Sequence, residues 1–246
     1  MNARLTVEQR PSPNHGERTP GPIDILLLHY TGMPGRAEAA LRWLCSPKSQ
    51  VSCHYFVFED GRVVQLVPED RRAWHAGASL WAGKADINSR SIGIEIANHG
   101  HPGGLPEYPD AQIEALIALC REIVGHHPIP PHRILAHSDV APGRKLDPGE
   151  HFPWRRLALA DIGHWVEPAD VEDGRSLRRG DAGPATEAFQ AMLALYGYGL
   201  ALDGRFGPRT EDVVAAFQRH FRPARVDGVA DRSTIRTLHR LLIPLP

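Results

Sequence analysis

The segment IDILLLHYT, at residues 23–31, contains four consecutive large apolar residues directly before a histidine. A continuous apolar run of this kind is typical of a strand that is fully buried, as in a sheet covered by helices on both faces. The run therefore predicts a layered α/β domain with this strand in its interior. His29 ends the strand, so its side chain should reach the rim of the sheet.

The residues that follow alternate between helix and strand patterns. Residues 37–45 predict a short helix, and residues 53–67 predict a β-hairpin that turns at Asp60–Gly61. Asp110 is a good N-cap for a longer helix, because apolar residues recur at helical spacing after it. These elements together predict a mixed β-sheet flanked by helices.

The composition along the chain predicts four segments, and it changes from a mixed to an arginine-rich, helical pattern near residue 176. Residues 177–246 hold ten arginines and no lysine, and three amphipathic stretches there predict a small all-α domain of three helices, at 184–196, 208–221 and 231–242. An Asp-Gly turn occurs twice, at Asp203 and Asp227, each followed by a threonine seven residues after the aspartate. The predicted segments are an extended, proline-containing arm (1–22), an α/β domain (23–165), a linker (166–175) and the helical domain (176–246).

The charge and cysteine content exclude several classes of partner and compartment. The net charge is −1 and the basic residues are scattered, so we expect neither a nucleic-acid nor a membrane partner. Three cysteines without CxxC spacing argue against a disulfide framework. No window reaches the ~18 apolar residues of a transmembrane helix, and the N-terminal residues lack the apolar segment of a signal peptide. We expect a cytoplasmic protein; a leader removed from this chain would instead place it in the periplasm.

The loop AHSDVAPGRKLDPG, at residues 136–149, concentrates polar side chains in a stretch that two prolines and two glycines keep irregular. Its His137 and Asp147, together with His29, make two imidazoles and one carboxylate, which is a known ligand set of catalytic zinc sites. A single histidine at a strand end is more often packed or hydrogen-bonded than metal-bound. The three residues together favour a metal site, and Lys145 in the same loop could neutralise a developing oxyanion.

Glu95 lies within SIGIEIA, at residues 91–97, where alternation places the three isoleucines on one face and Glu95 with Gly93 and Ala97 on the other. A carboxylate there could simply point into water on an exposed face of the sheet. Its small neighbours also leave room above that face, as the floor of a cleft requires. In that case Glu95 could serve as a general base towards a metal-bound water.

Five separated blocks resemble one enzyme family in their order and spacing. They are LLLHYTG, VSCHYFVFEDG, RRAWHAG, SIGIEIAN and the loop AHSDVAPGRKLDPG with the following FPWRRL. They resemble the zinc-dependent N-acetylmuramoyl-L-alanine amidases of the AmpD and AmiD type, which have the amidase type 2 fold, and the resemblance as a whole covers roughly residues 8–165. The tail FQAMLALYGYGLALDGRFGPRT resembles the three-helix peptidoglycan-binding module.

The resemblance implies hydrolysis of the amide bond between the lactyl group of MurNAc, or 1,6-anhydro-MurNAc, and L-Ala of the peptidoglycan stem peptide, in cell-wall recycling or turnover. It implies one zinc ion as cofactor and peptidoglycan fragments or muropeptides as partners. The implied roles are zinc ligands for His29, His137 and Asp147, catalysis for Glu95, stabilisation of the tetrahedral intermediate for Lys145, and lining or bracing of the substrate cleft for Tyr30, Trp74, His75 and Asn88.

Two other functions are compatible with these residues. The first is a non-catalytic protein that binds or senses muropeptides, although such proteins usually lack a zinc ligand and all three positions are filled here. The second is a zinc peptidase that cuts within the stem peptide. The helical domain could bind glycan, or it could only dock on the first domain and stabilise it.

Overall fold

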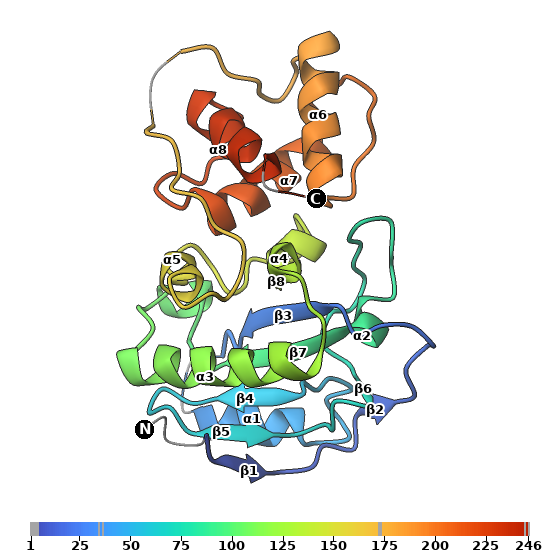
Figure 1. Cartoon of the computed structure of the whole chain (residues 1–246), viewed down its shortest axis with the longest axis vertical. Coiled ribbons are helices and arrows are strands. Elements are labelled where there is room, and N and C mark those ends of the chain that lie inside the picture. The colour runs from blue at the N-terminus through green and yellow to red at the C-terminus, as the bar shows by residue number, and fades with distance from the viewer. Residues whose placement is uncertain (1–4, 34, 36, 172–173, 244, 246) are drawn as a thin grey trace.

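The computed structural model describes residues 5–33, 35, 37–171, 174–243 and 245. Residues 1–4 of the predicted arm, 172–173 of the predicted linker, and 244 and 246 at the end of the predicted helical domain lie outside the described residues. A six-stranded sheet in the order β1-β5-β4-β7-β3-β8 forms the centre of the larger part (Figure 1). Its strands are β1 (Val7–Gln9), β3 (Ile25–Tyr30), β4 (Tyr55–Val57), β5 (Val63–Gln65), β7 (Ser91–Ile96) and β8 (Ile134–Ala136).

The pairing within this sheet is mixed, as predicted. All neighbouring strands run parallel except β4 and β5, which form the predicted antiparallel hairpin. Gly61 in its turn has a φ of 86°, and a Cβ atom there would lie 2.9 Å from the carbonyl oxygen of Ala111, so glycine is required on both counts. The predicted N-terminal arm supplies strand β1 at the edge of the sheet, and β2 (His15–Gly16) pairs separately with β6 (Arg72–Ala73).

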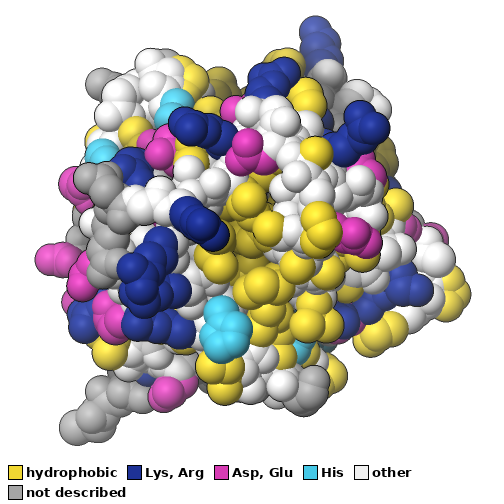
Figure 2. Space-filling view, turned by 90° about the horizontal axis from the view of Figure 1, so that it is seen from above, with side chains coloured by type: hydrophobic (Ala, Val, Ile, Leu, Met, Phe, Trp, Pro, Cys, Tyr) yellow, Lys and Arg dark blue, Asp and Glu magenta, His cyan; other side chains and the backbone are white. Residues whose placement is uncertain are grey.

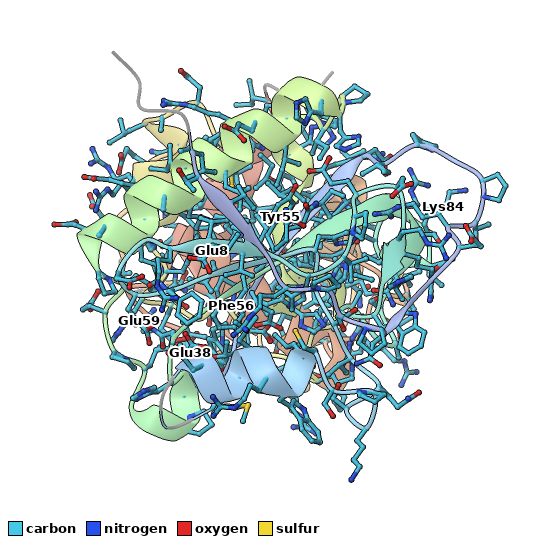
Figure 3. The ribbon with its side chains drawn as sticks, turned by 90° about the horizontal axis from the view of Figure 1, so that it is seen from below. Glu8, Glu38, Tyr55, Phe56, Glu59 and Lys84 are labelled. Carbon is cyan, nitrogen blue, oxygen red and sulfur yellow. The ribbon has the colours of Figure 1, made fainter. Side chains whose placement is uncertain are left out.

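Strand β3 is buried on both faces, which confirms the prediction from its continuous apolar run. Leu26 and Leu28 pack into the core beneath α3 (Asp110–His126), whereas Ile25 and Leu27 face the C-terminal helices. The next strands alternate in the same way. Tyr55 and Phe56 on β4 point to opposite faces (Figure 3), Tyr55 into the core under α3 and Phe56 into the core under α1 (Ala37–Leu44).

Helices α1 and α3 lie where the sequence predicts helices, with one correction. The residue that caps α3 is Pro109, and Asp110 is its first helical residue, so the prediction of Asp110 as the N-cap was wrong by one position. The fixed φ of proline suits a helix start, and the carboxylate of Asp110 still lies in the first turn, where it favours the helix dipole. The remaining short helices of this part are α2 (Ile87–Arg90), η1 (His101–Gly103), η2 (Pro131–Arg133), α4 (His137–Val140) and α5 (Trp154–Ala158).

The C-terminal domain consists of three helices, α6 (Pro184–Tyr196), α7 (Pro208–Phe221) and α8 (Arg232–Leu242) (Figure 1). The repeat seen in the sequence is a repeated hydrogen-bond pattern. The side chain of Gln190 donates to Asp203 and to Thr210 and accepts from the Gly204 N–H. One helix later, Gln218 makes the same contacts with Asp227, Thr234 and the Gly228 N–H. A buried glutamine therefore fixes each Asp-Gly turn to the start of the next helix.

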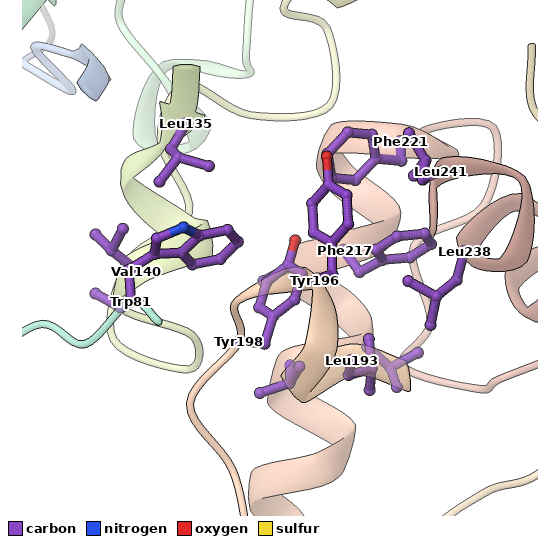
Figure 4. Close-up of a cluster of buried hydrophobic side chains, with 14 of the residues drawn as sticks. Trp81, Leu135, Val140, Leu193, Tyr196, Tyr198, Phe217, Phe221, Leu238 and Leu241 are labelled. Atoms are coloured by element: carbon purple, nitrogen blue, oxygen red, sulfur yellow. The ribbon is translucent and has the colours of Figure 1, made fainter. Parts of the chain in front are cut away.

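The C-terminal helices share one apolar core with the sheet domain. Figure 4 shows Trp81, Leu135 and Val140 of the sheet domain on one side of this core, with Tyr198 and Phe217 of the C-terminal domain on the other. Trp81 and Tyr198 pack with ring centroids 4.9 Å apart. The helical domain is therefore docked on the first one. Within the described residues, no helix combines the length and apolarity needed to span a membrane.

Candidate metal centre and catalytic cleft

A cleft of about 570 Å³ opens at the carboxyl ends of β3 and β7. One wall comes from α1, including Trp43, and the other from residues 144–147 of the loop after α4. Ligand sites of open parallel sheets commonly lie at this edge, because the loops that follow the strands meet there. His29 near the end of β3 is in register with Glu95 on β7, and His137 follows β8 directly.

Three ligand atoms converge at the floor of the cleft. The Nδ1 atoms of His29 and His137 are 2.9 Å apart, and Oδ2 of Asp147 lies 3.1 Å from the first and 2.9 Å from the second. Within the part of the chain that the structure describes, this is the one group of three or more such residues that could hold a metal ion. All three side chains are buried.

Both imidazoles are held so that Nδ1 is directed to this point. Nε2 of His29 lies 3.0 Å from Nδ1 of His75, whose Nε2 lies 3.2 Å from the Ser91 hydroxyl. The Ser91 hydroxyl donates in turn to the Ile87 carbonyl at 2.7 Å. With the protons on the two Nε2 atoms, every donor in this chain meets an acceptor, and Nδ1 of His29 keeps its lone pair. Such outer partners are typical of histidines that bind metals.

His137 is oriented by the backbone. Its Nε2 donates to the Ala76 carbonyl at 3.0 Å, which again leaves the Nδ1 lone pair available. Burial and, next in size, the nearby His137 together lower the pKa of His29 to about 4, so His29 is neutral at neutral pH. Burial alone would raise the pKa of Asp147, but the contacts of its carboxylate with His137 and then His29 outweigh burial and hold the pKa well below its usual value.

This donor set fits a zinc ion. Metal ligands must be neutral imidazole and ionised carboxylate, and the site favours the neutral form of His29 and the ionised form of Asp147. Zn–N and Zn–O distances of about 2.0–2.1 Å in a tetrahedral site place ligand atoms ~3.3 Å apart, close to the separations of the three atoms here. With only three protein ligands, a fourth position remains for water or substrate, as in catalytic rather than structural zinc sites.

Glu95 stands beside this group with an unpaired oxygen. It lines the cleft, and its Oε2 is buried without a hydrogen-bond partner. Burial raises the pKa of Glu95 well above its usual value; the negative charge of Asp147 raises it further, while Lys145 lowers it. An unpartnered carboxyl with a raised pKa next to a candidate metal site is suited to proton transfer.

The small residue predicted beside Glu95 has a specific purpose. A Cβ atom on Gly93 would lie 2.4 Å from Nδ1 of His75, so only glycine allows the His75 ring to lie over β7. The space that the sequence predicted above this face is therefore partly filled by His75, which lines the cleft and also holds His29.

The other predicted site residues take different positions. Lys145, Tyr30 and Trp74 line the cleft. Asn88 is buried and is not among the residues that line it; its Oδ1 accepts from the backbone N–H groups of His75 and Ala76, at 3.1 and 2.8 Å. Asn88 thus braces the segment that carries His75.

Sequence reasoning missed several residues that shape the site. Arg144 lines the cleft and donates to the Ala76 and Ala78 carbonyls. His101 also lines it, with Nδ1 2.9 Å from the Tyr30 hydroxyl and Nε2 3.0 Å from Glu150. Arg144 lies in the loop at residues 136–149 that the sequence singled out, but its role, like that of His101, arises from contacts between separate loops that no sequence pattern shows.

A buried set of two imidazoles and one carboxylate with an unpaired glutamate beside it, at the carboxyl ends of parallel strands, is typical of metal-dependent hydrolases. Residues 19–150 match the N-acetylmuramoyl-L-alanine amidase family, and residues 182–238 match a peptidoglycan binding domain family. The chain belongs to the N-acetylmuramoyl-L-alanine amidase family.

Its relatives agree with this assignment over most of the chain. It is 38% identical over 233 residues to the N-acetylmuramoyl-L-alanine amidase AmiD of Escherichia coli (strain K12), a match that covers 89% of this chain and 82% of that protein. The structure of E. coli AmiD in complex with the substrate anhydro-N-acetylmuramic acid-L-Ala-D-γ-Glu-L-Lys superposes with a TM-score of 0.75, over 89% of this chain and 88% of that one.

A second solved relative is AmpDH3 of Pseudomonas aeruginosa, in complex with anhydromuramic pentapeptide, with a TM-score of 0.74, 31% identity and coverage of 91% of this chain and 94% of that one. The 1,6-anhydro-N-acetylmuramyl-L-alanine amidase AmpD of Enterobacter cloacae is 43% identical over 107 residues, which are 44% of this chain and 55% of that protein. The sequence-based prediction of an amidase with a C-terminal helical domain is confirmed.

Proposed function

We propose that this protein uses one zinc ion, held by His29, His137 and Asp147, to cleave the amide bond between the lactyl group of MurNAc, or 1,6-anhydro-MurNAc, and L-Ala of the stem peptide. The observation that supports this most directly is the convergence of three buried ligand atoms within 3.1 Å of one another. The anhydro-muropeptides bound by AmiD and AmpDH3 support the substrate class.

In this proposal Glu95 moves the protons of the reaction. A zinc ion at this site would supply Lewis acidity, which polarises a carbonyl oxygen and acidifies water. The unpaired Oε2 of Glu95 accepts the proton of the attacking water and later delivers a proton to the departing L-Ala nitrogen. A single carboxyl can perform both transfers because the proton that it takes from water is the one that it later gives to the nitrogen, and its raised pKa favours the protonated form that must donate.

We propose that Lys145 stabilises the negative charge that develops on the carbonyl oxygen. Lys145 lines the cleft in the same segment as Asp147. Its ammonium group would attract the substrate carbonyl oxygen more strongly as negative charge develops on that oxygen during the reaction. Lys145→Met should lower kcat by about 10²-fold and leave zinc content unchanged. Steady-state kinetics on a muropeptide with metal analysis checks this, and Lys84→Met, an exposed lysine outside the cleft, is the control. Unchanged kcat in Lys145→Met would remove Lys145 from the mechanism.

The reaction is tested with a defined substrate. Incubation of the zinc-loaded protein with 1,6-anhydro-MurNAc-tripeptide and with MurNAc-tripeptide should release the intact tripeptide with a free L-Ala amino terminus, detected by mass spectrometry. Binding without release would instead identify a muropeptide-binding protein, and shorter peptide fragments would identify a stem-peptidase. The relative rates on the two substrates give the preference between anhydro and reducing ends.

We propose that the C-terminal domain also contacts peptidoglycan, as its family match suggests. Between α6 and α8 lies a groove lined by two apolar and three basic or imidazole side chains, namely Met192, Ile235, Arg236, His239 and Arg240. Seen from above, the helical side of the molecule presents an apolar strip bordered by Lys and Arg side chains (Figure 2). The compartment in which the protein acts stays a prediction from the sequence.

A further inference from the structure

Asp139 lies two residues after the candidate ligand His137 and is completely buried, with 0% of its surface exposed. It accepts three hydrogen bonds: from the backbone N–H of Ala136 at 2.8 Å, from the hydroxyl of Tyr198 at 2.6 Å and from Nδ1 of His220 at 2.6 Å. The first donor belongs to its own loop, and the other two belong to the C-terminal domain. A carboxylate of the sheet domain is therefore held mainly by side chains of the other domain.

The position of Asp139 determines how α4 begins. Its bond to the Ala136 N–H caps the short helix whose first residue is His137. A buried carboxylate without hydrogen-bond donors is costly to remove from water, and Tyr198 and His220 supply two of the three donors to Asp139. If these two donors are removed, we expect the Asp139 carboxylate to leave this position. The start of α4 then loses its hydrogen bond from the Ala136 N–H.

Helix α7 also supports the rest of the loop that joins the two ligands His137 and Asp147. Arg209 donates to the Pro142 carbonyl at 2.9 Å. Gly143 lies so close to α7 that a Cβ atom there would be 2.3 Å from Oδ2 of Asp212. The N–H of Ser138 donates to the carbonyl of Asp147 at 3.0 Å, which ties the two ends of the loop together.

The apolar contacts around Asp139 also come from both domains. Val140, the next residue, packs in the same core as Tyr198 and Phe217 (Figure 4). The His220 ring stacks on Trp154 with centroids 3.6 Å apart. These contacts fix the rings that carry the two donors, so the donors are preorganised towards Asp139.

We propose that the C-terminal domain takes part in building the metal centre, with Tyr198 and His220 as positioning residues that act through Asp139 on the ligand His137. This inference rests on the proposed zinc-dependent function. It assigns to the C-terminal helices a role that is separate from any contact with peptidoglycan, because the residues involved are buried against the sheet domain.

The test uses the full-length chain and variants that delete single donors. Tyr198→Phe removes one hydroxyl, and His220→Leu removes the second donor while keeping apolar bulk. Tyr196→Phe is the matched control, since it deletes a hydroxyl that bonds Nδ1 of His164 at 2.9 Å across the same domain interface. Zinc affinity of the metal-free proteins is measured by competition with a chromophoric chelator. Amide hydrogen exchange of residues 137–147 is measured in the same proteins without metal.

The expected result is a graded loss of zinc affinity. Removal of outer partners of metal ligands weakens binding by about 10–100-fold, so the double variant Tyr198→Phe/His220→Leu should fall in that range and each single variant below it. Exchange of residues 137–147 should accelerate in the same order. Tyr196→Phe should match the wild type in both measurements, and His220→Asn, which keeps an N–H donor near the position of Nδ1, should recover part of the loss.

Two outcomes separate this inference from the function on which it rests. The first outcome is that the wild-type protein binds zinc, while Tyr198→Phe matches Tyr196→Phe in zinc affinity and in the exchange of residues 137–147. This outcome overturns the positioning role of Tyr198 and His220. The conclusion holds even if the double variant fails to fold. If the wild type binds no zinc, the proposed function itself fails, whatever the variants do.

Discussion

Replacing Glu95 by glutamine should lower kcat on a muropeptide by about 10²–10⁴-fold and leave the zinc content at that of the wild type. Glutamine has nearly the same shape but can neither take a proton from the attacking water nor return one to the leaving nitrogen. Since Glu95 is in register with His29 but lies outside the converging ligand triangle, the metal site should survive the change.

The measurement combines steady-state kinetics with metal analysis of the purified variant. Glu107→Gln is a matched control, because its side chain is 82% exposed and lies outside the cleft, so it should keep wild-type kcat. Loss of zinc in Glu95→Gln would show that Glu95 is a ligand rather than the proton-transfer group. Retained turnover would show that another group moves the protons.

Replacing Asp147 by alanine should abolish both zinc binding and amidase activity. The change removes one of the three candidate protein ligands and the only negative charge among them, and it leaves the two imidazoles without the carboxylate. Extraction of zinc from the wild type with a chelator should abolish activity in the same way, and added zinc should restore it only in the wild type.

Thermal unfolding provides a readout that does not depend on catalysis. If zinc binds the folded state as proposed, saturating zinc should raise the Tm of the wild-type protein, since a ligand at 1,000 times its Kd adds about 4 kcal/mol of stability. Asp147→Ala should show no zinc-dependent change in Tm. Asp170→Ala, a substitution at an exposed aspartate outside the cleft, should behave as the wild type. A zinc-dependent rise in the Tm of Asp147→Ala would mean that the ion binds elsewhere.

The elements that the sequence predicted well are those with a strong local pattern. The apolar run of β3, the Asp60–Gly61 hairpin and the three C-terminal helices appear where periodicity placed them. The helix start at Asp110 was misplaced by one residue, because Pro109 and Asp110 are both favourable there and only the backbone conformation distinguishes them.

The candidate metal ligands could also be predicted from the sequence, for a chemical reason. Histidine and aspartate in an irregular loop, and a histidine at the end of a buried strand, carry costs of burial that metal binding offsets. Their partners were not accessible in this way. Nothing local marks Ser91 as the hydrogen-bond partner of His75, and only the family resemblance pointed to Asn88, as a residue that lines or braces the cleft.

The sequence by itself determined the layers of the sheet domain, the helical nature of the tail and the chemical identity of the candidate metal-ligand set, because each depends on periodicity or on residue type within short segments. The tertiary structure decided which nitrogen of each histidine faces the metal position, why Gly93 must lack a side chain, and that Tyr198 and His220 hold Asp139. These features depend on contacts between residues 16 to 118 positions apart in the chain, such as His29 with Asp147. Hydrogen-bond direction and close packing at such separations are set only when the chain folds, and the contacts of Asp139 only when the two domains come together.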